Sequence, residues 1–474
     1  MGNEAGSLLI GWDSRNMIPE RPALLRGMPT ARIGKKVIDP ITVTALALET
    51  ENSSRAIMVS ADLCAIDTGT MARARATLEN LAADFDPALM IVNATHTHTS
   101  LSGLSGIYPQ PKEDCMTPEE TVAFMGDKIA AAAAAAWRNR KPGAVAWGYG
   151  QAVVGHNRRA SYYSGETKMY GKTSDTEFSH IEGYEDHGVG LLFTFDKHKQ
   201  PTGVIVNLAC PSQCSASRSV ISADFWHEVR QEIRRQLGKK LFILPQCSAA
   251  GDQSPTLLLD KNAEARMLAF KEDVPVEKLN FDMAQRREIG RRIAAAVTEV
   301  LPLAAREIHD RVRFHHQPAI LELPIRLISD ADLAEAESEL AKAKKSLQAL
   351  DPAVEWNEYS RHYRQAYRYR RVIERHAAQK EKKTFAAEVH VVRLGDIVFA
   401  TNPFELFLDF GLQIKARSPA IQTFVVQLAG NGSYIPTERA LAGKGYGAEP
   451  VSNPVGPEGG KMIVEETIKI LKNL

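Results

Sequence analysis

The stretch AIMVSADLCAIDTGTMARARATLENLAADFDPALMIVNATHTHTS, residues 56–100, carries two short apolar runs with a helical pattern between them. The runs Ala56–Ser60 and Ala88–Asn93 are bounded by polar turn residues, which is typical of buried strands. The intervening segment Thr70–Ala83 predicts a helix. A strand, a helix and a second strand in this order favour an α/β fold with a largely buried sheet.

The same alternation continues along the chain. Further strands are predicted at Gly203–Leu208, Lys240–Leu244 and Asp396–Thr401, and further helices at Thr117–Trp137, Trp226–Leu237 and Met283–Val300. Two regions differ from this pattern. Asp330–Lys383 is rich in Ala, Glu, Lys, Arg and Tyr, is interrupted by Pro352, and predicts a helical hairpin inserted between sheet segments. Ala442–Gly460 is rich in glycine and proline and predicts a long ordered loop.

Composition narrows the class of protein. The chain has 474 residues, of which 44% are hydrophobic and 24% charged, values that fit a globular protein with a sizeable core. The net charge of +1 gives no indication of a nucleic-acid partner. No apolar run is long enough for a transmembrane segment, and no signal peptide is visible. The five scattered cysteines predict core residues and one or two ligands instead of a disulfide framework.

The segment Asn93–Ser100, Asn-Ala-Thr-His-Thr-His-Thr-Ser, directly follows a predicted strand. Two histidines at i and i+2 share one face of an extended chain, so His96 and His98 reach one cavity. Neutral imidazole ligates metals and also acts as a base near neutral pH. The structural alternative is a pair of hydrogen-bonded histidines at a strand end. The neighbouring Asn, Thr and Ser residues favour a functional site, because they supply supporting hydrogen bonds.

Three later segments also carry reactive groups. Gly251–Pro255 places Ser254 after a predicted strand, and its alternative is a plain Ser-Pro turn. Glu405, behind Pro403, follows another strand and is either a metal ligand or a helix-start glutamate. Tyr434 and Tyr446 are either functional hydroxyls or packing residues.

Taken in order, these segments resemble the neutral ceramidase family of zinc-dependent amidases, which cleave the N-acyl bond of ceramide. The resemblance rests on segments spread over about residues 8 to 450: Gly11-Trp12-Asp13, Ser60-Ala61-Asp62, Asn93–His98, Asn157-Arg158, Gly251–Pro255, Glu405, Tyr434 and Tyr446. It implies an α/β catalytic domain of layered mixed sheets flanked by helices, formed by residues 1–474, with the helical hairpin 330–383 as an insertion.

The resemblance also implies roles for single residues. His96, Glu405 and Tyr434 are the expected zinc ligands, Ser254 the nucleophile and His98 a catalytic imidazole. Arg158 and Tyr446 are expected to orient the substrate and stabilise negative charge, and Asn157 and Asp252 to contribute to substrate binding. Zinc polarises a carbonyl or activates an oxygen nucleophile, and cationic or hydroxyl donors hold the oxyanion.

The sequence departs from the family at one zinc ligand. The family has a further histidine before an Ile-Ser-x-Asp motif, whereas this chain has Asn207-Leu-Ala-Cys-Pro-Ser-Gln-Cys214 before Ile221–Asp224. Cys210 stands at or next to that place, and a thiolate is a sound zinc ligand. His227 and His156 are the other candidates, and loss or change of the metal is a further alternative.

A second departure concerns domain organisation. Neutral ceramidases are secreted or membrane-associated and carry a C-terminal immunoglobulin-like domain, which we do not expect here. The sequence therefore predicts a zinc-dependent hydrolase acting on an amide in a small-molecule substrate, in a secreted or periplasmic setting, with ceramide itself not the expected substrate. The alternatives are the same fold acting on a sugar or ester derivative, and a binding protein that lost the metal.

Overall fold

The structure is a computed structural model that describes residues 5–51 and 54–474. Its centre is a nine-stranded mixed sheet with the order β16-β14-β13-β8-β1-β5-β6-β7, in which β18 also pairs with β1. Its strands are β1 (Gly6–Asn16), β5 (Thr42–Thr50), β6 (Arg55–Ala61), β7 (Met90–Ala94), β8 (Lys141–Gln151), β13 (Gly188–Asp196), β14 (Pro201–Leu208), β16 (Phe242–Cys247) and β18 (Arg311–Val312). The pairs β6–β7 and β14–β16 are parallel, and the other pairs are antiparallel.

A second sheet of four strands has the order β19-β20-β21-β23. Its strands are β19 (Phe314–Pro324), β20 (Thr384–Leu394), β21 (Ile397–Thr401) and β23 (Gln422–Val426). The strands β21 and β23 are parallel, and β19 and β20 form a long antiparallel pair. The two sheets pack face to face through one apolar cluster, in which Met58 and Ile10 of the first sheet meet Phe399 and Phe424 of the second.

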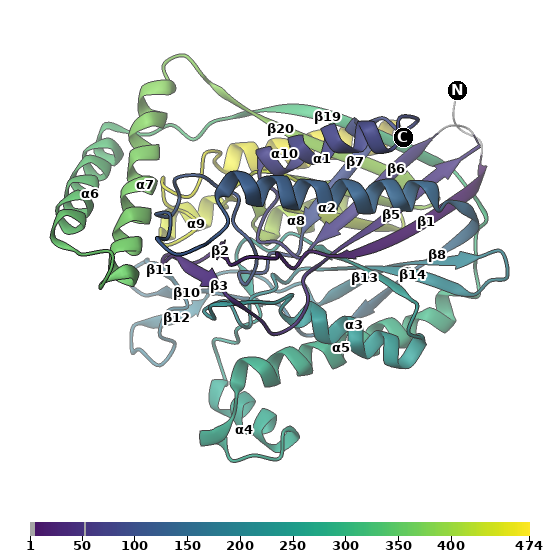
Figure 1. The fold of residues 1–474 in the computed structure, drawn as a ribbon, viewed down its shortest axis with the longest axis horizontal. Coiled ribbons are helices and arrows are strands. Elements are labelled where there is room, and N and C mark those ends of the chain that lie inside the picture. Colours follow the sequence, from purple (N-terminus) through teal and green to yellow (C-terminus); the bar gives the residue numbers. More distant parts are fainter. Residues whose placement is uncertain (1–4, 52–53) are drawn as a thin grey trace.

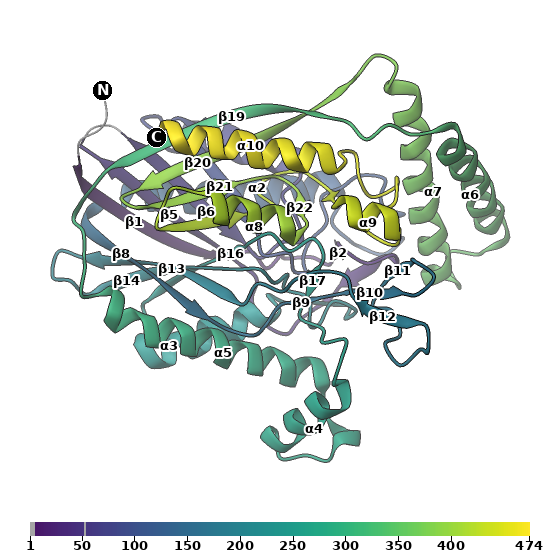
Figure 2. The ribbon, with the colours of Figure 1, turned by 180° about the vertical axis from the view of Figure 1, so that it is seen from behind.

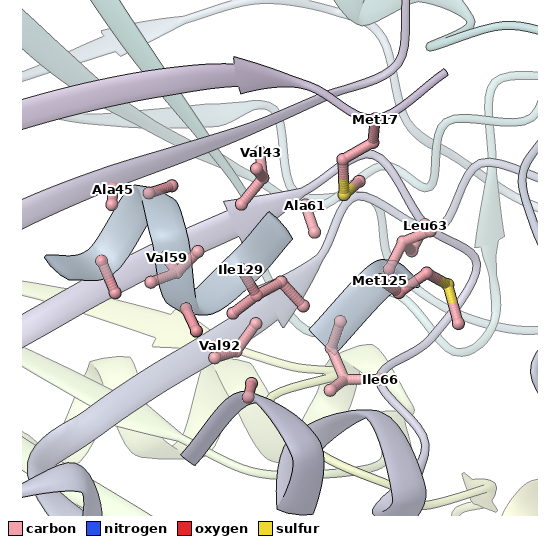
Figure 3. Packing of buried hydrophobic residues seen from close by; sticks show 14 of the residues in the cluster. Met17, Val43, Ala45, Val59, Ala61, Leu63, Ile66, Val92, Met125 and Ile129 are labelled. Carbon is pink, nitrogen blue, oxygen red and sulfur yellow. The ribbon is translucent and has the colours of Figure 1, made fainter. Parts of the chain in front are cut away.

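The alternation of side chains along each strand divides the core into layers. In β6, Ile57 and Val59 point to the cluster under the helices, whereas Met58 points to the second sheet. Figure 3 shows the helix-side cluster, where Val59 and Val92 of the sheet meet Ile129 of α2 (Pro118–Arg138). This two-sided burial explains why the strands are apolar runs in the sequence.

Helices cover both outer faces, so the molecule has four layers: helices, sheet, sheet, helices (Figures 1 and 2). One face of the large sheet is covered by α1 (Thr68–Leu81), α2, α3 (Phe225–Leu237) and α5 (Phe281–Ala304). The outer face of the second sheet is covered by α8 (Leu408–Arg417) and α10 (Pro457–Asn473). The predicted α/β class, with layered mixed sheets flanked by helices, is confirmed.

Two helices stand apart from these layers at one end of the molecule (Figure 1). They are α6 (Asp330–Ala349) and α7 (Trp356–Ala378), which lie between β19 and β20 in the chain. Ser329 and Asp332 form a capping box that starts α6. Both helices pack on each other and on the loops at that end of the sheets, which are the loops that carry the site. No helix in the described residues is long and apolar enough to cross a membrane.

Candidate functional site

The polar segments predicted from the sequence meet at one edge of the two sheets. The parallel pairs β6–β7, β14–β16 and β21–β23 bring the carboxyl ends of six strands to this edge. In open α/β sheets ligands bind at such ends. The loops after these strands carry Cys64, His96, Gln213, Gly251 and Glu405, so the fold alone places these residues near one another.

His96 is the centre of the site. It is buried, with an exposed fraction of 4%, and its φ of 63° is left-handed, so the backbone is not extended here as the sequence had suggested. The rings of His96 and His98 nevertheless meet, with centroids 5.1 Å apart. The Nδ1 atom of His96 lies 2.6 Å from the carbonyl oxygen of Cys64 and donates to it. In the neutral ring this bond leaves the lone pair on Nε2, which faces Glu405 Oε2 at 3.0 Å.

A short parallel pair of strands places Glu405 beside Tyr434. The strand β22 (Glu405–Leu406) pairs with β24 (Tyr434–Ile435), and Glu405 is the register partner of Tyr434. Burial raises the pKa of Glu405, but the charge of His96 and hydrogen bonds from His96 and Tyr434 outweigh it and lower the pKa. Burial, together with the carboxylate of Glu405, raises the pKa of Tyr434 well above its ordinary value. Glu405 is therefore an anion whose neighbours are an imidazole and a phenol.

These three side chains fit a metal ion. With Nδ1 donating to Cys64, both His96 Nε2 and Glu405 Oε2 are acceptors, and two acceptors at 3.0 Å need a cation between them. His96 Nε2 is also buried without a well-aligned hydrogen-bond partner in the described chain. Ligand atoms at about 2.0 Å from a tetrahedral zinc ion lie about 3.3 Å apart, close to the spacing seen here. Imidazole, carboxylate and phenolate are a donor set that suits zinc.

Without a metal, a proton takes the place of that cation. Burial lowers the pKa of His96, but the nearby Glu405 and Cys64 outweigh it and raise the pKa well above its ordinary value. The metal-free site therefore holds an imidazolium–carboxylate pair. Binding of a metal has to displace this proton, because a histidine ligand must be neutral.

A thiol that the sequence analysis did not single out, that of Cys64, lies beside the two histidines. Cys64, His96 and His98 each offer a ligand atom, and these atoms all lie within 4.8 Å of one another. The Sγ atom of Cys64 is 3.9 Å from His96 Nδ1. Cys64 follows β6, the strand that neighbours β7, so its place next to His96 results from strand order.

Cys210, the thiol that we predicted as a ligand, is turned away from this group. It is fully buried in an apolar cluster under α3 and α5, where its Sγ contacts the carbonyl oxygen of Val154 at 3.3 Å. Burial and the neighbouring Cys247 raise the pKa of the Cys210 thiol well above its ordinary value. A thiol in these surroundings is a core residue, so the structure does not support Cys210 as a ligand.

The two histidines named as alternatives lie elsewhere too. His227, on α3, contacts Gln231 at 2.8 Å, and His156 contacts Glu185 at 3.1 Å. Neither joins the group formed by Cys64, His96 and His98.

His98 lies beside His96 as a neutral imidazole. Burial lowers its pKa well below the ordinary value, and the positive charges of His96, Arg32, Arg158 and Arg364 lower it further. Its Nε2 accepts from the side-chain amide of Gln213 at 2.9 Å, so the ring hydrogen is on Nδ1. This Nδ1 is buried and has no hydrogen-bond partner in the described residues, which leaves a free donor inside the site.

Arg32 holds the loop that carries His98. Its guanidinium donates to four backbone carbonyls, among them that of His98 at 2.7 Å. The threonines next to the histidines also fix this loop by hydrogen bonds. Thr97 and Thr99 bond to each other and to the carbonyl oxygen of Ser222, as expected from the polar character of this segment.

Arg158 and Tyr446 stand at the other side of Tyr434. Arg158 is buried and donates to the hydroxyl of Tyr434 at 3.2 Å and to the carbonyl of Gly251 at 2.8 Å. The ring of Tyr446 meets that of Tyr434 edge to face, with centroids 5.5 Å apart. A cation and two phenols thus adjoin the carboxylate of Glu405, and together they can hold a developing oxyanion.

The segment Gly251–Ser254 packs against the backbone of Glu405. A Cβ atom on Gly251 would lie 2.4 Å from the carbonyl oxygen of Glu405, so only glycine permits this approach. The carboxylate of Asp252 accepts from Asn157 Nδ2 at 3.0 Å and from the backbone N–H of Leu408 at 2.9 Å. Asn157 and Asp252 therefore bind each other and the backbone, which fixes this segment, and their contact with substrate stays a prediction.

No hydrogen bond joins the hydroxyl of Ser254 to His96 or His98 among the described residues. Ser254 is fully buried, and its Oγ accepts from the N–H of Thr256 at 2.9 Å, which is the Ser-Pro turn considered as the alternative. In the strand pair β9 (His156–Asn157) and β17 (Gln253–Ser254) its register partner is His156. The described contacts thus provide no base for a Ser254 nucleophile.

The sequence analysis also did not predict Gln213 and Arg32, nor Arg364 and Arg368 of α7. The signal for Cys64 was available, because it follows a predicted strand that neighbours the strand before His96. Arg32 and Gln213 reach His98 only because the loops that carry them fold next to it. Their neighbours in the sequence form no motif that would have predicted these contacts.

Comparison with known proteins agrees with this geometry at the level of the fold. No protein-family model matches the chain, and no curated protein sequence matches it significantly. The crystal structure of neutral ceramidase from Pseudomonas aeruginosa superposes with a TM-score of 0.67 at 17% identity, covering 99% of this chain and 75% of that one. A ceramidase complexed with C2 gives a TM-score of 0.66 at 16% identity, with 99% and 76% covered. The chain therefore has a neutral-ceramidase-like fold.

Proposed function

We propose that this protein is a zinc-dependent hydrolase that cleaves an amide bond of an N-acyl compound. The observation that carries the proposal is the approach of His96 Nε2 to Glu405 Oε2 at 3.0 Å, two acceptors with Tyr434 beside them. The likeness to ceramidase structures supports a hydrolase, and the donor set supports zinc.

His96, Glu405 and Tyr434 would hold the ion. The Sγ atom of Cys64 lies 3.9 Å from the other ring nitrogen of His96, so the thiol would have to turn towards Nε2 to serve as the sulfur donor in place of the family's further histidine. Zinc in such a site supplies Lewis acidity, which polarises a carbonyl and lowers the pKa of water. A thiolate makes the site softer, and so favours zinc over magnesium or manganese.

The chain's own residues account for the remaining steps of amide hydrolysis. A C–O bond forms between water and the acyl carbon, the C–N bond breaks, and the proton of water passes to the leaving nitrogen. His98, a neutral imidazole whose Nδ1–H has no partner in the described residues, is placed to donate a hydrogen bond to the acyl oxygen. Arg158, Tyr434 and Tyr446 are placed to stabilise the negative charge that forms on the acyl oxygen.

Metal analysis of matched cysteine variants tests the centre directly. We expect about one zinc per purified chain, since such sites bind a single ion. Cys64→Ala should lose the thiolate-to-cobalt charge-transfer band of the cobalt-substituted protein, and Cys210→Ala should retain it. Purified protein that neither contains zinc nor binds added zinc would refute the metal site, and a band retained by Cys64→Ala would refute Cys64 as a ligand.

A substrate panel tests the reaction. N-acyl amides, matched esters and glycosides are offered to the zinc-loaded protein, with His96→Ala as the inactive control. The proposal predicts turnover of the amides that is lost in His96→Ala. Cleavage of glycosides alone would favour a different reaction on the same fold.

A further inference from the structure

One face of α7 packs on the loop that precedes Arg32, the residue that holds His98. Trp356, Ser360, Arg364 and Arg368 follow one another at intervals of four residues and so share a face of the helix. Trp356 Nε1 donates to the carbonyl oxygen of Ala31 at 3.2 Å, and Ser360 Oγ accepts from the N–H of Ala31 at 3.0 Å. The loop around Ala31 leads directly to Arg32, which holds His98. The inner face of α7 is thus fixed against the site.

Arg364 extends from this face towards His98. Its guanidinium donates to the hydroxyl of Tyr108 at 2.9 Å and lies over that ring, 5.3 Å from the centroid. Tyr108 in turn donates to the carbonyl oxygen of Met28, the neighbour of Gly27, and Gly27 packs on the imidazole of His98. Of the five N–H donors of a guanidinium, the contact with Tyr108 uses one.

Arg368, one turn further along, approaches the site from the tyrosine side. Its guanidinium lies over the ring of Tyr446, 5.6 Å from the centroid, and donates to Ser452 Oγ at 3.1 Å. Tyr446 in turn packs on Tyr434, the partner of Glu405. Arg364 and Arg368 are both partly exposed, so ligands can reach them.

The arginines on the outer face of the same helix behave differently. Arg361 pairs with Glu358 at 2.9 Å, and Arg371 pairs with Glu374 at 2.9 Å. Arg364 and Arg368 form no ion pair with any residue that the structure describes. Two outer arginines of the helix are therefore paired with carboxylates, whereas Arg364 and Arg368 have no carboxylate partner among the described residues.

The interior of the site adds to this excess of positive charge. Arg32 and Arg158 are both buried, and their hydrogen bonds go to backbone carbonyls and to a phenol. Glu405 is the carboxylate at the centre, and His96 already neutralises it. A neutral substrate would leave these cations uncompensated, whereas an anion held by charge-assisted bonds would balance them.

We propose that the substrate carries an anionic oxygen group (a carboxylate, sulfate or phosphate) that Arg364 and Arg368 bind at the rim while the amide lies at His96 and Glu405. The position of the amide rests on the proposed function, but the anion subsite does not. Each guanidinium group presents parallel N–H donors that can bind the paired oxygens of such a group. The inference separates this protein from an enzyme for an uncharged amide such as ceramide.

Binding of compounds that cannot be hydrolysed tests the subsite. The probes are ketones in which a methylene replaces the amide nitrogen of N-hexanoylglycine, one with the carboxylate and one with a neutral carboxamide, together with the phosphonate counterpart. Titration calorimetry with the zinc-loaded protein should give an affinity for an anionic probe about tenfold or more above that for the neutral one. This preference should fall as the salt concentration rises.

Paired variants of α7 give the controls. The double variant Arg364→Gln/Arg368→Gln should lose the preference, Arg364→Lys/Arg368→Lys should keep part of it, and Arg361→Gln/Arg371→Gln on the outer face should keep all of it. Equal affinity of the wild type for anionic and neutral ketones, binding of neither, or an unchanged preference in the inner glutamine variant would overturn the proposal. If that variant does not fold, the lysine variant and the salt dependence decide.

The same experiment separates the two proposals. A wild-type protein that prefers the anionic ketones but hydrolyses no amide would refute the hydrolase and leave the anion subsite in place. Hydrolysis of neutral and anionic N-hexanoyl amides with equal efficiency would refute the anion subsite and leave the proposed hydrolase in place.

Discussion

The α-carbon of Gly27 lies against the imidazole of His98, and this contact leaves no room for a side chain. A Cβ atom at Gly27 would lie 2.4 Å from His98 Cγ, and the φ of Gly27 is +104°. The position of His98 therefore depends on a glycine in a loop that is remote in sequence.

Gly27→Ala should displace His98 and lower amide hydrolysis by about 100-fold, since a shift of about 1 Å in a catalytic group has an effect of that size. Zinc content should not change. Gly106→Ala is the matched control, because Gly106 also has a positive φ, of +73°, but no neighbour within 4 Å. Steady-state kinetics and metal analysis of both variants check this. Equal losses in the two variants would mean that backbone strain, and not the contact with His98, is responsible.

Ser254→Ala should retain activity within about tenfold of the wild type, because the change removes one neutral hydrogen bond from a turn. Glu405→Gln should lower zinc affinity by at least about 100-fold, the upper range for loss of a group that only supports a ligand. Kinetics and zinc titrations measure the two effects. A folded, zinc-loaded Ser254→Ala protein without activity would restore the serine to the role of nucleophile.

Asp62→Asn should destabilise the fold strongly. Asp62 and Arg230 form a buried two-bond ion pair at 2.8 and 3.0 Å under the loop that carries His96, and Asp62 also accepts from Thr95. Leaving the charge of Arg230 uncompensated costs about 3–5 kcal/mol of unfolding free energy. The exposed pair Arg73–Asp127 gives the control, for which Asp127→Asn should cost about 1 kcal/mol or less. Urea unfolding tests both, and similar losses would contradict the prediction.

Acid should destabilise the protein in part through His316. Burial, with a further contribution from His390 at 2.9 Å, lowers the pKa of His316 to about 4. The unfolded chain takes up this proton near pH 6.5 and the folded chain only near pH 4, so stability falls as the pH falls through this window. His316→Gln should remove up to about 3 kcal/mol of that pH dependence, from a shift of about 2.5 units.

His315→Gln is the control for this pH effect, because His315 is the exposed neighbour on the same strand. Unfolding free energies measured in urea from pH 8 to pH 4 give the comparison. The same slope in wild type and His316→Gln would assign the acid sensitivity to other groups.

Much of the frame of the site could be predicted from sequence. Apolar runs marked β6, β7, β14, β16 and β21, and polar residues just after them marked the edge where ligands bind. His96, Glu405, Tyr434 and Arg158 come together as expected, because each lies in or near a strand that ends at this edge.

The other residues of the candidate site could not be predicted, because their roles depend on the direction in which each side chain points. The periodicity of the sequence does not specify that direction. Cys210 and Cys64 both follow strands, but the first points into the core under α3 and the second towards His96. Ser254 resembled a nucleophile in sequence, whereas the turn to Thr256 uses its hydroxyl. The composition of Asp330–Lys383 predicts a helical hairpin but does not distinguish one arginine of α7 from another, and only the packing of the hairpin separates its inner arginines from its outer ones.

The pairing of Glu405 with Tyr434 in β22 and β24 has a consequence for the order in which the molecule forms. His96 belongs to the first quarter of the chain and its partners to the last, so the centre closes one of the longest loops in the fold. Contacts of such sequence separation form late, because chain entropy opposes them until the intervening sheets are in place. A growing polypeptide on the ribosome thus carries free histidines and thiols for most of its synthesis. The metal site that we propose is therefore complete only when the final strands and helices have been added.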